Sequence, residues 1–336
     1  MDQMSDPQRT EPRMSEPQMS EPQWRPKIGL ALGSGVARGW AHLGVLRALN
    51  RYGIEPDVVA GTSIGAVVGG IHLAGKADAL EAWARSLSKV RMISYLDFRV
   101  RNGGMLGGRH LTDAMRRDLG ETRIEDLTTP FVSVATDLVT GHEVWLRKGD
   151  LVDAMRMSFS LPGIFEPMQH EQRWLVDGAL VNPVPVSVCR ALGAQMVIAV
   201  NLNADIIGKE RRAGAAVPTV AGFDLLSELQ RSDEAAPKSR ISALANRIFR
   251  REPSHPSMFG VMISALGIVQ DRISRSRLAG EPPDVHITPR LGNVGLFEFD
   301  RADEIIAEGE ESVERVVEDL HDAISIFGRE PYDNGN

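Results

Sequence analysis

The stretch Asp57-Val-Val-Ala-Gly-Thr-Ser-Ile-Gly65 decides the fold of this chain, because an apolar run leads directly into a glycine–serine turn. A small-residue helical pattern, 66–74, follows. This order is typical of a nucleophile elbow, in which a serine at the tip of a sharp strand-to-helix turn has strained torsions. The turn closes only when the residues two before and two after the serine lack side chains, and Gly61 and Gly65 flank Ser63 in this way. Alone the pattern is weak, since the chain carries 32 glycines.

Length and composition allow a large core and one or two domains in the 336 residues. The net charge of -7 gives no electrostatic reason to expect a nucleic-acid partner. The only cysteine, Cys189, excludes an intramolecular disulfide and a thiolate zinc cluster, and we interpret it as a small core residue. His110, His142 and His170 have no metal-ligand spacing with any pair of acidic residues. We therefore expect neither a metal nor a cofactor.

The N-terminal residues 1–26 repeat a short Ser/Thr-acid-Pro theme with almost no apolar content, which predicts a disordered tail. They lack the charged and apolar regions of a signal peptide. The longest apolar run, 258–269, contains Ser264 and two glycines and is too short to span a bilayer. We expect a cytoplasmic protein, with at most peripheral contact to a membrane surface.

From Lys27 onward, short apolar strands alternate with helical patterns, which predicts an α/β sheet covered on both faces. The expected strands are 28–32, 58–60, 131–135, 143–146, 174–176, 196–202 and 284–287. The expected helices are 38–52, 66–74, 77–88, 151–157, 186–192, 257–278 and 301–322. We assign 27–204 to the catalytic core, 257–325 to helices and a strand that complete the same domain, and 326–336 to a disordered tail.

Residues 205–256 interrupt this alternation and are polar, without a strand signal, so we interpret them as an insertion or a flexible lid. Within them, 238–251 carries five cations and no acid, with apolar residues at helical spacing. A basic amphipathic helix of this kind can lie on an anionic membrane surface. A solvated helix that packs its apolar stripe on the body of the protein is the alternative.

The loop Gly33-Ser-Gly-Val-Ala-Arg-Gly39 follows the first strand and opens a helix, so its N–H groups can point into one cavity. Such a loop can stabilise the oxyanion formed when a serine attacks a carbonyl, or it can hold a phosphate. Dinucleotide binding requires an acid at the end of the second strand. Asp57 begins that strand instead, and the serine turn occupies its end. The pattern therefore disfavours a nucleotide.

A nucleophilic serine needs a base, and the residues leave two choices open. A Ser-His-Asp hydrolase offers a histidine late in the chain, and His255, His286 and His321 are candidates, although none follows a strong strand in a recognisable turn. The better signal is Trp174-Leu-Val-Asp177, followed by Gly178 and Ala179, which places an aspartate at a strand end on a glycine turn. An Asp-Gly pair alone is an ordinary turn signal.

These motifs together resemble the patatin-like phospholipases, and within them the bacterial RssA and neuropathy-target-esterase-like branch. The resemblance rests on 30–46, Gly-Thr-Ser-Ile-Gly65 and Asp177-Gly-Ala179, in that order. Linking segments agree as well: Val134-Ala-Thr-Asp-Leu-Val-Thr-Gly141, Ser158-Phe-Ser-Leu-Pro-Gly-Ile-Phe-Glu-Pro167 and Asn182-Pro-Val-Pro185. The similarity is nearly continuous from Ile28 to Leu202 and weak beyond.

The resemblance implies a three-layer α/β/α fold with a mostly parallel central sheet. It also implies a catalytic dyad, with Ser63 as nucleophile and Asp177 as a base that contacts it directly. The implied oxyanion hole maps to the loop residues Ser34, Gly35, Val36 and Ala37, supported by Gly33, Arg38 and Gly39. Ser34 and Val36 depart from the family's glycines, and the β-branched Val36 cannot adopt a positive φ cheaply.

The implied function is that of a serine acyl hydrolase acting on the carboxylic esters of lipids. Two other classes stay open, a Ser-His-Asp α/β-hydrolase and a non-catalytic regulatory or interaction protein on the same fold. Arg38 can brace the glycine loop or neutralise a phospholipid phosphate, and Phe165 is a candidate for lining an acyl pocket. The sequence carries no signal for an oligomeric state.

Overall fold

The computed structural model describes residues 25–88, 98–101, 104–106, 108–204 and 258–328. The expected insertion 205–256, its basic stretch 238–251 and the candidate His255 lie outside the described residues. Of the expected tail 1–26, only the last two residues are described, and there Arg25 forms a bidentate pair with Asp57 at 2.7 and 2.8 Å. The described chain therefore makes contact with the domain two residues earlier than expected.

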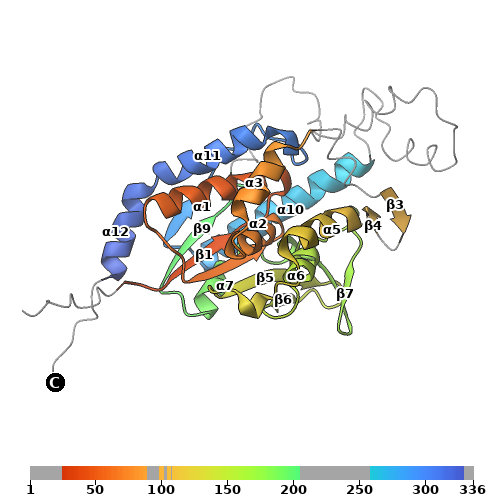
Figure 1. The fold of residues 1–336 in the computed structure, drawn as a ribbon, viewed down its shortest axis with the longest axis horizontal. Helices are drawn as coiled ribbons and strands as arrows, with labels where there is room; N and C mark the ends of the chain where they lie inside the picture. Colours follow the sequence, from red (N-terminus) through yellow and green to blue (C-terminus); the bar gives the residue numbers. More distant parts are fainter. Residues whose placement is uncertain (1–24, 89–97, 102–103, 107, 205–257, 329–336) are drawn as a thin grey trace, which may run out of the picture.

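An eight-stranded sheet forms the centre of the molecule, in the order β10-β9-β1-β2-β5-β8-β7, with β6 also paired to β5. The five strands from β10 to β5 run parallel, whereas β6, β7 and β8 pair in antiparallel fashion (Figure 1). The strands are β1 Ile28–Leu32, β2 Val58–Thr62, β5 Phe131–Asp137, β6 Glu143–Leu146, β7 Met168–His170, β8 Arg173–Asp177, β9 Met196–Val200 and β10 Val285–Ile287. The expected mostly parallel sheet is confirmed.

Helices cover both faces of this sheet, which gives the expected three layers. On one face lie η1 Val36–Trp40, α1 Ala41–Arg51, α2 Ile64–Leu73, α3 Ala77–Arg85, α5 Arg109–Leu119, α6 Leu151–Ser158, α11 Ala302–Glu314 and α12 Val317–Phe327. On the other face lie α7 Val186–Ala191 and α10 Met258–Gly280. Short 3-10 turns complete the described chain: η2 Ile124–Asp126, η3 Gly178–Leu180 and η4 Phe299–Arg301.

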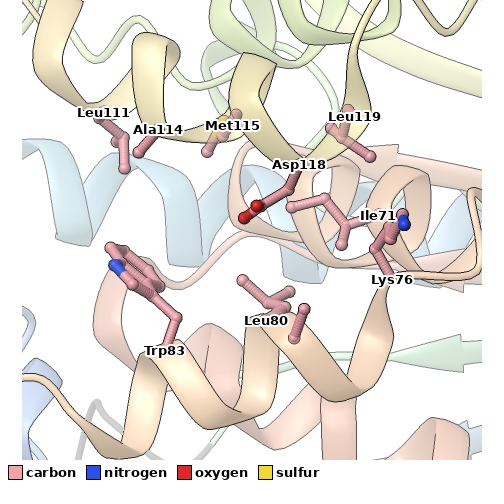
Figure 2. Close-up of a pocket in the computed structure, with 10 residues that line it drawn as sticks. Ile71, Lys76, Leu80, Trp83, Leu111, Ala114, Met115, Asp118 and Leu119 are labelled. Carbon is pink, nitrogen blue, oxygen red and sulfur yellow. The ribbon is translucent and has the colours of Figure 1, made fainter.

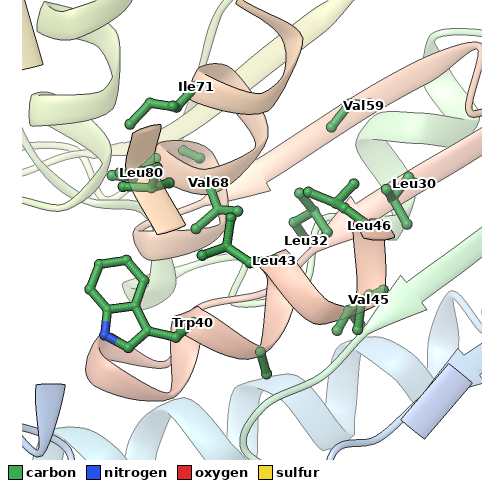
Figure 3. Close-up of a cluster of buried hydrophobic side chains, with 14 of the residues drawn as sticks. Leu30, Leu32, Trp40, Leu43, Val45, Leu46, Val59, Val68, Ile71 and Leu80 are labelled. Carbon is green, nitrogen blue, oxygen red and sulfur yellow. The ribbon is translucent and has the colours of Figure 1, made fainter. Parts of the chain in front are cut away.

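The alternation of side chains along the strands explains these layers. Leu30 and Leu32 of β1 point into the larger core with Val59 of β2, as Figure 3 shows. The residues that alternate with these leucines, Gly29 and Ala31, are small and face α7. A Cβ on Gly29 would lie 2.7 Å from the Cβ of Cys189. The short side chains let α7 pack close to the sheet, and Cys189 is buried there as predicted.

Several elements differ from the sequence-based prediction. The hairpin β3 Phe98–Arg101 with β4 Gly104–Leu106, the helix α5 and the strand β7 were not expected. Helix α5 buries only Met115 and Leu119 among many charged residues, so its apolar stripe is too narrow to recognise.

The single helix expected at 301–322 is two helices in the structure, with a break at Val316. Helix α11 packs on α1, whereas α12 packs on β9 and β10. Helix α12 also includes residues 326 and 327, which were assigned to the tail.

Within the described part of the chain, no helix combines the length and the hydropathy needed to cross a membrane.

Candidate active site

The strand pairing along one edge of β5 brings the end of β2 and the end of β8 together. Thr62, the last residue of β2, pairs with Val134 of β5. Asp177, the last residue of β8, pairs with Ala135, the next residue of β5. Strand β6 pairs with Val134 and Ala135 from the opposite edge of β5. Strand β8 therefore pairs with the same edge of β5 as β2 does, beginning one residue after the end of β2. Ser63, which follows Thr62, therefore meets Asp177.

Ser63 lies at the tip of the turn between β2 and α2, with φ 57° and ψ -122°. A positive φ is rare for a residue with a side chain, and it costs on the order of 1–3 kcal/mol. Around it the chain is too tight for side chains: a Cβ on Gly61 would lie 2.5 Å from the Cα of Ala66, and one on Gly65 would collide with the carbonyl of Leu32. The geometry is that of the expected elbow.

Ser158 at the end of α6 holds this turn in place. Its hydroxyl accepts a hydrogen bond from the Ser63 N–H at 2.8 Å and donates one to the Val134 carbonyl at 2.5 Å. The Ser158 side chain is buried. The sequence motif that begins at Ser158 was recognised, but its contact with the nucleophile's own N–H was not, because only the fold brings α6 under the elbow.

The Ser63 hydroxyl donates a hydrogen bond of 2.7 Å to Asp177 Oδ2. The other carboxylate oxygen, Oδ1, accepts the Ala179 N–H at 2.8 Å. The Asp177 N–H is bonded to the Ser160 carbonyl at 2.9 Å. Gly178 is required in this turn, because a Cβ there would collide with the carbonyl of the neighbouring strand β5. The aspartate is thus fixed at its backbone and at both oxygens.

Burial controls the protonation of this pair. Ser63 and Asp177 are 6% and 2% exposed. Desolvation raises the pKa of Asp177 to about 7, although the Ala179 N–H and the Ser63 hydroxyl both act in the opposite direction. A carboxylate with a pKa near neutrality is a better proton acceptor at pH 7 than an exposed one, because general-base efficiency improves as the pKa approaches the working pH.

The histidine candidates lie elsewhere. Among the described residues, no histidine forms a hydrogen bond with Ser63 or Asp177. His286 is on the edge strand β10, and His321 stacks edge-on against Tyr52 with ring centroids 6.0 Å apart. His42 is buried in α1, where its Nε2 is 2.7 Å from the Gly33 carbonyl, and burial lowers its pKa to about 4. His42 thus supports the glycine loop as a neutral side chain.

The four loop residues assigned to the oxyanion hole differ in what their N–H groups contact. The Ser34 N–H donates to the Pro183 carbonyl at 2.9 Å, and the Ala37 N–H donates to the Leu296 carbonyl at 3.0 Å. The N–H groups of Gly35 and Val36 have no hydrogen-bond acceptor among the described residues. The N–H groups of Ser34 and Ala37 are therefore already engaged, which makes those of Gly35 and Val36 the candidates for oxyanion donors.

Gly35 and Val36 both adopt demanding positions. A Cβ on Gly35 would lie 2.8 Å from Cδ1 of Leu202 and 2.9 Å from its Cβ, so the loop packs on Leu202, two residues beyond β9, only with glycine. Val36 has φ 53°, the left-handed region that a β-branched side chain disfavours. The strain expected at Val36 is therefore present in the backbone, and the Val36 N–H has no acceptor in the described part of the chain.

Arg38 braces the loop. Its Nε and Nη2 donate to the Val294 carbonyl at 2.9 and 2.7 Å, and the side chain is buried. Burial lowers the pKa of Arg38 to about 10, opposed by the charge of Glu298. Of the two flanking glycines, Gly33 donates its N–H to the Val200 carbonyl at 3.0 Å, and Gly39 packs where a Cβ would collide with Ile64. These contacts favour the bracing role of Arg38 over phosphate binding.

A pocket between α3 and α5 is separate from this site. Figure 2 shows its apolar walls, which include Leu80 and Trp83 on one side and Leu111 and Met115 on the other. Neither Ser63 nor Asp177 lines it. The nearest part of α2 is Ile71, about 12 Å along the helix from Ser63 at 1.5 Å per residue. The pocket is therefore not the reaction centre.

Comparisons with known proteins bear on the class of this site. The family model of the patatin-like phospholipases matches residues 30–190. An uncharacterized NTE family protein of Mycobacterium tuberculosis is 35% identical over 321 residues, covering 84% of this chain and 89% of that protein. Patatin-like phospholipase domain-containing protein 6 of Homo sapiens is 32% identical, and Lysophospholipase NTE1 of Mycosarcoma maydis 37% identical.

Each of the last two matches spans 183 residues and 52% of this chain, but only 13% and 10% of the longer relative, respectively. Among solved structures, that of VipD from Legionella pneumophila covers 92% of this chain with a TM-score of 0.37 and 12% identity, which is too low to carry an argument.

The fold and the site together define an α/β protein whose mostly parallel sheet presents a serine elbow beside a buried aspartate. Within that class, this chain belongs to the patatin-like phospholipase family. It is accordingly a carboxylic ester hydrolase of the lipid-hydrolysing type.

Proposed function

We propose that this chain hydrolyses lipid esters through a Ser-Asp dyad, with Ser63 as the nucleophile and Asp177 as the general base. The observation that carries the proposal is the buried hydrogen bond of 2.7 Å between the Ser63 hydroxyl and Asp177 Oδ2. A nucleophile and a base within hydrogen-bond reach are the minimum for covalent acyl transfer. The raised pKa of Asp177, about 7, supports its role as the proton acceptor at neutral pH.

Acylation begins when Ser63 Oγ attacks the ester carbonyl carbon and its proton passes to Asp177 Oδ2. The carbonyl oxygen gains a negative charge, and the free N–H groups of Gly35 and Val36 are the proposed donors to it. Collapse of this intermediate breaks the bond to the alkoxy group, which leaves as the alcohol with the proton from Asp177. The acyl group then remains on Ser63 as an ester.

Deacylation repeats the sequence with water. Asp177 takes a proton from a water molecule, the resulting hydroxide attacks the acyl-enzyme carbonyl, and the same two N–H groups stabilise the second oxyanion. Ser63 leaves with the proton and the fatty acid is released. In this proposal one carboxylate is the only acid–base group for both steps, so much of the rate acceleration must come from the oxyanion donors. One such donor typically contributes 100-fold to 1000-fold.

The substrate class follows from the family, and one relative suggests where to begin. The name lysophospholipase belongs to the matching protein of Mycosarcoma maydis. A single-chain phospholipid is therefore the first lipid to test, with a diacyl phospholipid and a simple ester beside it. The contact of 238–251 with an anionic membrane stays a prediction, as does the cytoplasmic location.

The test compares Ser63→Ala with Ser312→Ala on lysophospholipid and on p-nitrophenyl butyrate. Ser312 is also a buried serine, but its hydroxyl donates to the Gly309 carbonyl within α11. We expect Ser63→Ala to abolish the hydrolysis of both substrates while the far-ultraviolet circular dichroism is unchanged, and Ser312→Ala to remain active. Turnover of either ester by a folded Ser63→Ala protein would refute the assignment.

A further inference from the structure

A small apolar cluster, separate from the cores on the two faces of the sheet, lies where three segments of the chain meet. We call it the apolar cluster, and its residues come from the chain after α6, from α10 and from the loop before η4; they include Leu161, Ile164, Met262, Ile263, Leu266 and Leu296. Leu161, Ile164 and Ile263 are buried, whereas Met262, Leu266 and Leu296 remain half-buried. The cluster therefore retains apolar surface that the described part of the chain leaves partly accessible.

The apolar cluster is tied to both halves of the candidate active site. Leu161 directly follows Ser160, whose carbonyl accepts the Asp177 N–H at 2.9 Å. The backbone carbonyl of Leu296 accepts a hydrogen bond of 3.0 Å from the Ala37 N–H. The cluster thus adjoins the aspartate turn on one side and the oxyanion loop on the other.

We infer that the apolar cluster receives the acyl chain of the ester substrate. The inference rests on the proposed function, because it assumes a carbonyl held between Ser63 and the N–H groups of Gly35 and Val36. An acyl chain that continues from such a carbonyl gains free energy by covering half-buried apolar side chains. A polar head group gains nothing from them, so the cluster is assigned to the fatty acid and not to the alcohol.

The pocket in Figure 2 is the rival position for the chain, since it too has apolar walls. It provides a matched control. Leu266 in the apolar cluster and Leu111 in that pocket are both half-buried leucines on helices. Leu266→Ala and Leu111→Ala therefore remove the same atoms from similar surroundings, and they differ in which of the two apolar sites they alter.

The experiment measures kcat/KM of the full chain for p-nitrophenyl butyrate and p-nitrophenyl palmitate. We expect Leu266→Ala to lower kcat/KM for the palmitate roughly 10-fold, because a few lost methylene contacts weaken transition-state binding by that order. The butyrate, whose chain is too short to cover the cluster, should change less than about twofold. Leu111→Ala should leave the ratio of the two rates unchanged.

Three results would overturn the inference: no loss with Leu266→Ala, an equal loss with both esters in a folded protein, or a loss confined to Leu111→Ala. If Leu266→Ala does not fold, Met262→Ala replaces it, because Met262 belongs to the same apolar cluster and is likewise half-buried. Failure here is distinct from failure of the proposed function, because the latter is decided by Ser63→Ala alone.

Discussion

Ser63 and Asp177 touch although 114 positions separate them in the chain, because β2 and β8 occupy successive parts of one edge of β5. No side chain lies between the two groups: Ser63 Oγ is 2.7 Å from Asp177 Oδ2. The base of the proposed reaction is therefore also the group that orients the nucleophile. Four consequences of this arrangement can be measured before the central claim itself is tested.

The first concerns the pH dependence of activity. The pKa of Asp177 is raised to about 7 by burial, and only its ionised form accepts the proton of Ser63. We expect kcat/KM to rise about tenfold per pH unit below 7 and to level off above it. An exposed carboxylate, with an ordinary pKa of about 3.9, would give a flat profile between pH 5 and pH 8. A flat profile would contradict the assigned pKa.

The second concerns stability. The folded-state pKa of Asp177 is raised, so at neutral pH the fold is penalised for holding a charge that the unfolded chain carries in water. This penalty is absent below about pH 4, grows as the pH rises, and is complete above about pH 7, on the order of 4 kcal/mol. Asp177→Asn should therefore unfold at a higher temperature than the wild type at pH 8 while losing its activity.

The control for this effect is the same measurement near pH 4, where both chains carry a neutral group at position 177 in the folded state. The difference in the free energy of unfolding should shrink toward zero there, because the asparagine amide can still donate to Ser63 and its oxygen can still accept the Ala179 N–H. A constant difference at both pH values would assign the effect to packing and not to charge.

The third concerns Ser158, which is bonded to the N–H of the nucleophile. Ser158→Ala leaves that buried N–H without a partner, which costs about 1–3 kcal/mol, and it releases the strained turn at Ser63. Ser133→Ala is the matched control, since Ser133 is also buried and donates to the Ala154 carbonyl without touching Ser63. We expect both to lower the melting temperature, but only Ser158→Ala to lower kcat at 25 °C. Equal kcat values in the two variants would remove the positioning role of Ser158.

The fourth concerns the oxyanion loop. Gly35→Ala brings a Cβ to 2.8 Å from Cδ1 of Leu202, so the loop must shift and its free N–H groups move with it. We expect kcat to fall 100-fold or more, roughly the value of one oxyanion donor. Gly267→Ala on α10, where a Cβ meets nothing within 4 Å, should leave kcat unchanged. An active Gly35→Ala protein would show that this loop does not hold the oxyanion.

The elbow was predictable because its demands are local. A strand, two glycines around Ser63 and a helix lie within one short stretch, and Gly61 and Gly65 meet steric limits that any such turn imposes. Asp177 stood out in the sequence as an aspartate at a strand end on a glycine turn, but its role as the base was implied only by the resemblance, since an Asp-Gly pair by itself is an ordinary turn. What brings Asp177 to Ser63 is the register of β8 on β5, and neither strand encodes that register locally.

Other features depend on tertiary contacts in the same way. Which loop N–H groups stay free is decided by the distant carbonyls of Pro183 and Leu296, so the sequence could not separate Gly35 and Val36 from their neighbours. Helix α5 was missed because its buried stripe is narrow, and the break at Val316 because two helices pack on different partners. The short strand β7 forms only by pairing with β8.

The most direct test of the dyad is the covalent adduct formed with a fluorophosphonate, located by peptide mass spectrometry in the wild type, in Ser63→Ala and in Asp177→Asn. We expect one adduct, on Ser63 in the wild type, formed faster as the pH rises through 7. We expect none in Ser63→Ala, and slow labelling without that pH dependence in Asp177→Asn. An adduct on another residue, or wild-type labelling rates in Asp177→Asn, would contradict the dyad.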